Sequence, residues 1–142
     1  MDYTNRFART PHVKYIFSHA GGSILYLAAR FAIIDEMGFI AGGERRGSAA
    51  DMFRRMYWDT ALSASDPVLR MLRDVAGINQ VLYGTDFPYL RRDLVVNSRQ
   101  HILQSSTLND SDHRAILGGN AARLFPRLQS DMASSSLVGK TE

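Results

Sequence analysis

The sequence predicts an α/β fold in which short parallel strands alternate with helices. Three observations support this class: β-branched and aromatic runs recur along the chain, two of them end in glycine-containing turns, and helix-spaced apolar segments follow them. Strands that alternate with helices in this way pair in parallel through right-handed crossovers. Both an open α/β sheet and part of a barrel satisfy the pattern.

The first strand–helix unit begins with residues 13–18, a β-branched and aromatic run that ends at the turn His19-Ala20-Gly21-Gly22. Residues 23–37 then carry apolar side chains at helical spacing and predict a helix that stops near Gly38. The next ten residues, 38–47, hold four glycines and two arginines, which predicts a mobile loop long enough to cover a site.

The second unit starts at Ser48, which with Asp51 makes a capping box for a helix to about residue 56. Residues 56–60 read as a strand. Asp66-Pro67 then supplies an N-cap and a first helical proline. Apolar residues at i, i+3, i+4 and i+7 follow, and Gly77 predicts a left-handed C-terminal cap.

The third strand covers residues 80–83 and ends in a turn, residues 84–89, that contains Asp86. A helix from about 93 to 105 and two short helices, 109–117 and 120–125, complete the predicted domain, residues 1–128. The Ser/Gly-bearing residues 129–142 predict a disordered tail.

Composition narrows the classes of function. With 45% hydrophobic and 22% charged residues among 142, the chain is an ordinary globular domain. No apolar stretch of about 18 residues occurs and the N-terminus is polar, so we expect a cytoplasmic protein that does not enter membranes. The net charge of +3 comes mainly from scattered arginines, typical of a solvated surface and not of a nucleic-acid footprint. Without cysteine, a metal can be held only by imidazole and carboxylate groups.

Two candidate reactive residues follow strands. His19 and Asp86 each lie just past a predicted strand, where the loops of a parallel sheet face one crevice. We therefore expect both at the same end of adjacent strands, converging on one cavity. Taken singly, each also fits a structural turn residue.

Four ordered segments carry a family resemblance: HAGG at residues 19–22, YWDTA at 57–61, LYGTDFPY at 82–89 and NAARLF at 120–125. Together they resemble the amidohydrolase-related family, and within it the branch of aminocarboxymuconate-semialdehyde decarboxylase and the fungal 6-methylsalicylate decarboxylases. The resemblance runs from about residue 13 to residue 128. It implies the C-terminal part of a TIM-type (β/α)8 barrel, with the three strands corresponding to strands six to eight.

The resemblance also implies roles for single residues. His19 matches a general acid/base and Asp86 an aspartate that lies against the metal, as ligand or as base toward its bound water. Arg30, eleven residues after His19, matches an arginine that binds the substrate carboxylate. Asp59 is expected to orient its neighbours and stands outside the catalytic set. Gly22 stands where related aromatic-acid decarboxylases often place an acid, which favours the aminocarboxymuconate-like branch.

The family's other metal ligands, a His-x-His pair and a further histidine, have no match here, because His12, His101 and His113 lie in other contexts and read as surface residues. The implied activity is non-oxidative decarboxylation of a small conjugated or aromatic carboxylic acid. It would use one divalent metal, zinc first and manganese second, bound in part by Asp86.

Two alternatives to this activity stay open. The first is hydrolysis of an ester, lactone or amide through a metal-bound water. The second is a catalytically inactive partial barrel, because such barrels typically need about 250 residues. A partial barrel would leave a parallel sheet edge uncovered, so we also expect a homo-oligomer or association through that edge.

Overall fold

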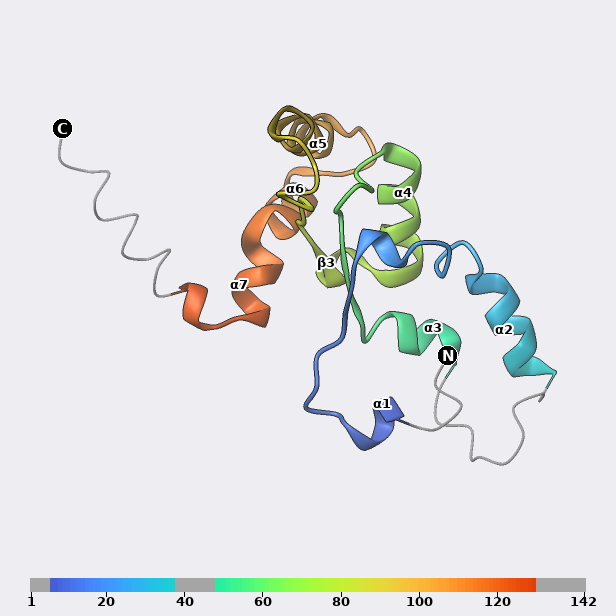
Figure 1. Cartoon of the computed structure of the whole chain (residues 1–142). Helices are drawn as coiled ribbons and strands as arrows, with labels where there is room; N and C mark the ends of the chain where they lie inside the picture. Colours follow the sequence, from blue (N-terminus) through green and yellow to red (C-terminus); the bar gives the residue numbers. More distant parts are fainter. Residues whose placement is uncertain (1–5, 38–47, 130–142) are drawn as a thin grey trace, which may run out of the picture.

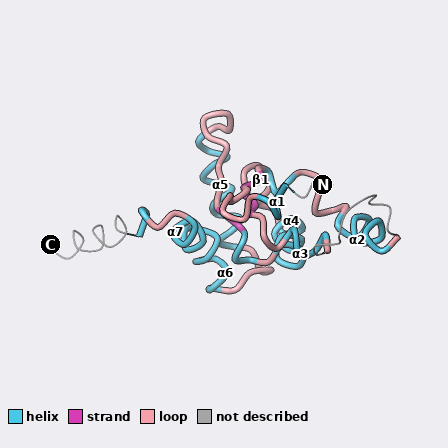
Figure 2. Tube along the Cα trace, turned by 90° about the horizontal axis from the view of Figure 1, so that it is seen from below, coloured by secondary structure: helices cyan, strands magenta, loops and turns pink. Residues whose placement is uncertain are grey.

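The computed structural model describes residues 6–37 and 48–129, which form helices around a small parallel sheet (Figure 1). The strands are β1 (Ile16–Phe17), β2 (Tyr57–Asp59) and β3 (Val81–Leu82), in the order β1-β2-β3. Both pairings are parallel, so the predicted parallel α/β class is confirmed. Figure 2 shows the strands near the centre, with α2 towards one end of the molecule and α7 towards the other.

The helical elements follow the predicted order with shifted boundaries. In chain order they are α1 (Arg6–Arg9), η1 (His19–Gly21), α2 (Ala28–Glu36), α3 (Ala49–Phe53), α4 (Asp66–Met71), η2 (Leu72–Ala76), η3 (Ile78–Gln80), α5 (Arg92–Gln104), α6 (Asp110–Arg114), η4 (Ala115–Gly119) and α7 (Asn120–Leu124). Two of them, η2 and η4, are π-helical segments that continue α4 and α6. The sequence pattern does not distinguish such segments from α-helix, because the apolar spacing is nearly the same.

The predicted capping box at α3 is present. The Ser48 side chain accepts a hydrogen bond from the Asp51 amide, and the Asp51 carboxylate accepts one from the Ser48 amide at 3.0 Å. This backbone hydrogen bond, with a second from the Ser48 hydroxyl, lowers the pKa of Asp51. The helix ends at Phe53, earlier than the predicted residue 56, because the chain turns there into β2.

The predicted N-cap of α4 was one residue too late. Ser65 is the N-cap and Asp66 the first helical residue. The Asp66 carboxylate instead accepts a hydrogen bond from the Ser105 hydroxyl at 2.6 Å, which ties the start of α4 to the segment after α5. Gly77 is the C-cap of η2 with the positive φ expected, 91°, but its ψ of 138° lies outside the left-handed helical region, so the predicted left-handed cap was wrong in form.

The core is built around Trp58, which is fully buried in the central strand. Its indole stacks on Phe17 with ring centroids 5.2 Å apart, and its Nε1 donates to the Phe53 carbonyl at 3.1 Å. A Cβ atom on Gly21, which has φ +71°, would lie 2.3 Å from the Trp58 ring. The turn after β1 therefore packs directly against this tryptophan, and only glycine fits there.

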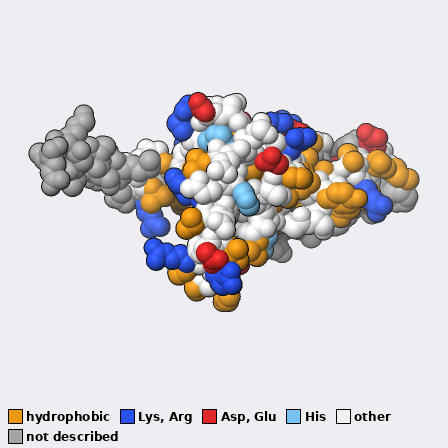
Figure 3. Space-filling model, turned by 90° about the horizontal axis from the view of Figure 1, so that it is seen from above, with side chains coloured by type: hydrophobic (Ala, Val, Ile, Leu, Met, Phe, Trp, Pro, Cys, Tyr) orange, Lys and Arg blue, Asp and Glu red, His pale blue; other side chains and the backbone are white. Residues whose placement is uncertain are grey.

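Helix α2 departs from the prediction. The helix begins at Ala28, since residues 24–27 form turns, and it has no buried residue. Figure 3 shows hydrophobic side chains gathered over the α2 end of the molecule, where Tyr26, Ile33 and Met37 are 79%, 53% and 61% exposed. Phe31 and Ala28 nevertheless pack against the core, with the Phe31 and Phe53 ring centroids 6.1 Å apart, so the helix is covered on one side only.

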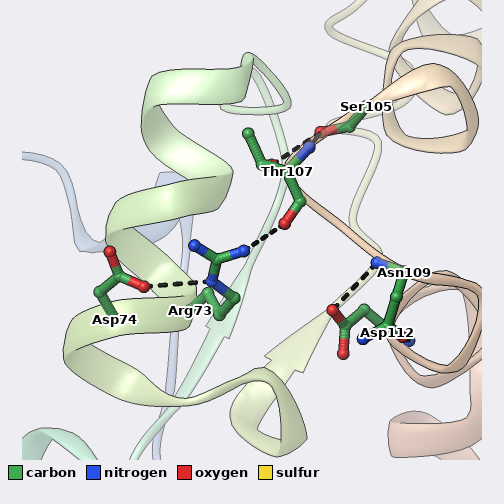
Figure 4. Close-up of polar contacts among 6 residues, drawn as sticks. All are labelled: Arg73, Asp74, Ser105, Thr107, Asn109 and Asp112. Atoms are coloured by element: carbon green, nitrogen blue, oxygen red, sulfur yellow. Dashed lines mark hydrogen bonds and ion pairs between the residues drawn. The ribbon is translucent and has the colours of Figure 1, made fainter.

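The segment after α5 is tied to the α4–η2 helix by polar contacts (Figure 4). The Arg73 guanidinium donates to the Thr107 carbonyl and pairs with Asp74 at 3.1 Å. The Ser105 and Thr107 hydroxyls lie 2.8 Å apart in hydrogen-bond contact. These contacts hold the segment between α5 and α6 against the α4–η2 helix.

Two predicted segments fall outside the described residues: the loop 38–47, and the tail 129–142 apart from Gln129. Gln129 is ordered by hydrogen bonds, since its amide donates to the Pro126 carbonyl at 3.0 Å and its side chain to Ala122 at 3.1 Å. Within residues 6–37 and 48–129, no helix combines the length and apolarity needed to cross a membrane.

Asn120 provides a test of how β3 is held. Its buried side-chain amide donates to the carbonyls of Ile78 and Val81 at 2.7 and 2.6 Å. Losing both donors leaves buried acceptors unsatisfied, so Asn120→Ala should lower the free energy of unfolding by about 2–4 kcal/mol. Asn79→Ala, at an exposed position, is the control and should cost roughly 0.5 kcal/mol or less. Urea unfolding measures both; equal losses would contradict this account.

Candidate active site

Three polar side chains follow the carboxyl ends of the three strands. His19 comes two residues after β1, Asp59 is the last residue of β2, and Asp86 comes four residues after β3. Because all three strands run parallel, these ends lie at one edge of the sheet. The expectation of one common end is confirmed, but the expectation of adjacent strands was wrong, because β2 lies between β1 and β3.

Asp59 contacts the histidine turn directly. Its Oδ1 accepts hydrogen bonds from the His19 amide at 2.8 Å and from the Ala61 amide at 3.0 Å. The His19 Nδ1 lies 3.2 Å from the Ala61 carbonyl oxygen. The ends of β1 and β2 are therefore joined by a closed set of three hydrogen bonds.

The end of β3 is held against the same aspartate. A Cβ atom on Gly84 would lie 3.0 Å from both Cβ and Cγ of Asp59. The Gly84 amide donates to the Thr60 hydroxyl at 3.2 Å, and the Thr60 amide donates to the Leu82 carbonyl at 3.0 Å. Asp59 thus contacts the segments that follow β1, β2 and β3.

Asp86 stands in a strained turn and offers its carboxylate. Its φ is +59°, a left-handed value that non-glycine residues adopt at an energetic cost. Its carbonyl accepts from the Leu90 amide at 3.0 Å, whereas no donor within the described ranges contacts its half-buried carboxylate. Burial raises the pKa of Tyr83, the residue directly after β3.

The described residues do not by themselves make a metal site. No three His, Asp or Glu side chains gather in residues 6–37 and 48–129 as a metal ion would require. Asp86 fits as one anionic oxygen ligand. His12 and His101 are exposed, as predicted, whereas His113 is half-buried and its Nε2 has no hydrogen-bond partner in this part of the chain, so its prediction as a surface residue was wrong.

Arg30 does not join the histidine cluster. It lies exposed on α2, and within the described ranges it makes no ion pair. The structure therefore brings together His19, Asp59 and Ala61, with Gly84 against Asp59, but it does not bring Arg30 to them.

Comparison with known proteins identifies the family. A family model described as Amidohydrolase matches residues 1–127 of the chain. The chain belongs to the amidohydrolase family. It is 32% identical to the 6-methylsalicylic acid decarboxylase of Penicillium expansum over 127 residues, which are 89% of this chain and 39% of that protein.

Solved structures of the family share the fold. The 5-carboxyvanillate decarboxylase of Sphingomonas paucimobilis matches with a TM-score of 0.73 and 26% identity, over 84% of this chain and 36% of that one. A dihydroxybenzoic acid decarboxylase of Polaromonas, solved with manganese and an inhibitor, matches with a TM-score of 0.70 and 21% identity, over 87% and 37%. This confirms the predicted fold class, part of a (β/α)8 barrel. The chain spans somewhat more than a third of the length of these relatives.

Sequence reasoning missed two contributors to this cluster. The Ala61 carbonyl and the Thr60 hydroxyl both act beyond the end of β2. A backbone carbonyl leaves no signal in a sequence. Asp59, by contrast, was recognisable from its place in the YWDTA motif and was expected to orient its neighbours.

Gly84→Ala tests the contact between β3 and Asp59. Gly84 has no left-handed φ, so the substitution acts only through the 3.0 Å approach to Asp59. Overpacking of this kind should lower the free energy of unfolding by about 1–3 kcal/mol. Gly118→Ala, where an added Cβ meets nothing within 4 Å, is the matched control and should change stability much less. Thermal unfolding of both variants measures the loss of stability. An equal loss in Gly84→Ala and Gly118→Ala would contradict the close packing of Gly84 against Asp59.

Proposed function

We propose that the chain is part of a metal-dependent, non-oxidative decarboxylase of a small aromatic or conjugated carboxylic acid. In this proposal residues 1–128 are the barrel portion that carries strands six to eight. The supporting observation is the placement of His19 and Asp86 beyond parallel strands of one sheet, in a chain similar to 6-methylsalicylic acid decarboxylase. The protein would act in the cytoplasm on a small-molecule substrate.

His19 is the proposed acid of the reaction. An imidazole titrates near neutrality and transfers protons readily at physiological pH. The imidazolium gives its proton to the carbon that bears the carboxylate, the bond from that carbon to the carboxylate breaks, and carbon dioxide leaves. The electron pair of the broken bond returns to the substrate's conjugated system, so atoms and charge balance.

Asp86 is the proposed metal ligand, and Arg30 the proposed anchor for the substrate carboxylate. Zinc is our first choice and manganese the second, the latter because a structural relative was solved with manganese bound. When bound, such an ion supplies Lewis acidity toward substrate oxygens. Its remaining ligands would come from outside the described residues, and the exposed position of Arg30 leaves its guanidinium free to meet an anion.

Association is part of the proposal. β1 forms an edge of the sheet, where Val13 and Ile16 are 40% and 44% exposed, and the apolar side chains of Ile33 and Met37 are exposed at α2. Burying such surface releases about 25 cal/mol per Å². We propose that this edge pairs with further barrel strands or with a second copy of the chain.

Carbon dioxide release tests the proposed activity. The chain would be co-expressed with the first five strands of the Penicillium expansum relative, and the purified assembly supplied with zinc or manganese and carboxyl-labelled 6-methylsalicylate. We expect labelled carbon dioxide. His19→Ala should abolish its release at unchanged metal content, because it removes only the proton donor. Asp86→Ala should lower both metal content and rate.

Arg30→Ala should chiefly raise KM, because an anchoring contact present in both ground and transition states affects binding more than the chemical step.

Two outcomes would favour the alternative functions. Full metal content with no decarboxylation, but with ester or lactone hydrolysis that Asp86→Ala abolishes, would favour the hydrolase. Failure to assemble, with no activity, would favour the inactive partial barrel.

A further inference from the structure

The contact between His19 and Ala61 fixes which ring nitrogen carries a hydrogen. The Ala61 carbonyl oxygen, 3.2 Å from Nδ1, can only accept a hydrogen bond. Nδ1 must therefore be the donor, and the neutral ring is the tautomer with its hydrogen on Nδ1. Nε2 then holds the free lone pair.

The Ala61 backbone is in turn fixed by Asp59. The same carboxylate oxygen accepts from the Ala61 amide at 3.0 Å and from the His19 amide at 2.8 Å. We propose that Asp59 is a positioning residue that acts through the Ala61 backbone to hold His19 as the Nδ1–H tautomer, so that Nε2 exchanges the proton with substrate. The catalytic part of this inference rests on the function proposed above, whereas the tautomer does not.

Both turns that meet at this contact need such support. His19 and Ala20 have φ values of 55° and 52°, and Leu62, next to Ala61, has 54°. These left-handed conformations cost energy for residues other than glycine and persist only where surrounding contacts hold them. An ionised carboxylate that accepts two backbone N–H groups is a strong contact of this kind.

Asp59 is itself confined. A Cβ atom added to Gly84 would lie only 3.0 Å from the Asp59 Cβ and Cγ, closer than almost all such atoms approach. The Asp59 side chain thus lies between the segment that follows β3 and the turn that contains His19. A general acid needs a fixed ring orientation. The packing around Asp59 fixes the His19 ring, and Asp59 need not contact the substrate to do so.

The inference assigns the proton path atom by atom. In the imidazolium, the Nδ1 hydrogen stays engaged with the Ala61 carbonyl, and the Nε2 hydrogen is the one transferred to the substrate carbon. The ring returns to the neutral Nδ1–H form as carbon dioxide leaves. No other proton donor or acceptor is required for the transfer.

Nitrogen NMR of the full 142-residue chain, labelled at histidine, tests this directly. The ¹⁵N shifts of neutral His19 should report hydrogen on Nδ1, and its amide should be protected from exchange. In Asp59→Ala the tautomer ratio should move toward Nε2–H by about 2- to 10-fold, the equivalent of one ordinary hydrogen bond. Amide exchange at His19 should accelerate by roughly 10-fold or more, because a charge-assisted bond is lost.

Asp59→Asn is the conservative variant. Its amide oxygen still accepts hydrogen bonds, so it should retain the Nδ1–H tautomer with weaker amide protection. Asp74→Asn, at an exposed aspartate that pairs with Arg73, is the matched control and should leave both readouts unchanged.

A wild-type ring with its hydrogen on Nε2 overturns the inference at once, even if Asp59→Ala fails to fold. If the Asp59→Ala protein is less stable but keeps the Nδ1–H tautomer of His19, Asp59 has a structural role only and the proposed positioning role is wrong. A fixed tautomer in a protein that, assembled as above, releases no carbon dioxide would leave the positioning role standing and refute the proposed function.

Discussion

The carboxylate of Asp59 is the contact on which the rest of the sheet edge depends. It lies at the end of the central strand, accepts two backbone amides, and packs against Gly84 beyond the third strand. Trp58, the residue before it, fills the core and leaves no space for a side chain at Gly21. Two consecutive residues of β2 thus secure the histidine turn, Trp58 by packing and Asp59 by hydrogen bonding.

Much of this arrangement was predictable because local rules and global fold agree. The capping box at Ser48 and the parallel pairing of the strands both followed from residue type and spacing. His19 and Asp86 could be placed at one sheet edge because parallel strands share one carboxyl end. The motif resemblance identified the family correctly.

What escaped prediction has physical causes. The Ala61 carbonyl acts through the backbone, which the residue type does not reveal, and π-helical turns share the apolar spacing of α-helix. The spacing in α2 indicated one buried face, but the helix is only half-covered: Phe31 packs against Phe53 of α3, whereas Ile33 and Met37 stay exposed. His113 was expected at the surface because it falls within a predicted helix, outside the family motifs, whereas its Nε2 is buried in the fold.

We propose that the ends of β1, β2 and β3 form one site, in which Asp86 would be a metal ligand. Titrating Mn²⁺ into the ¹⁵N-labelled chain tests it, because a bound paramagnetic ion broadens the amide signals nearest to it. The account predicts that signals of Asp86, Gly84, Ala61 and His19 broaden together, and that Asp86→Asn removes the effect. Broadening around Asp86 while His19 and Ala61 stay sharp, or broadening that survives Asp86→Asn, would contradict it.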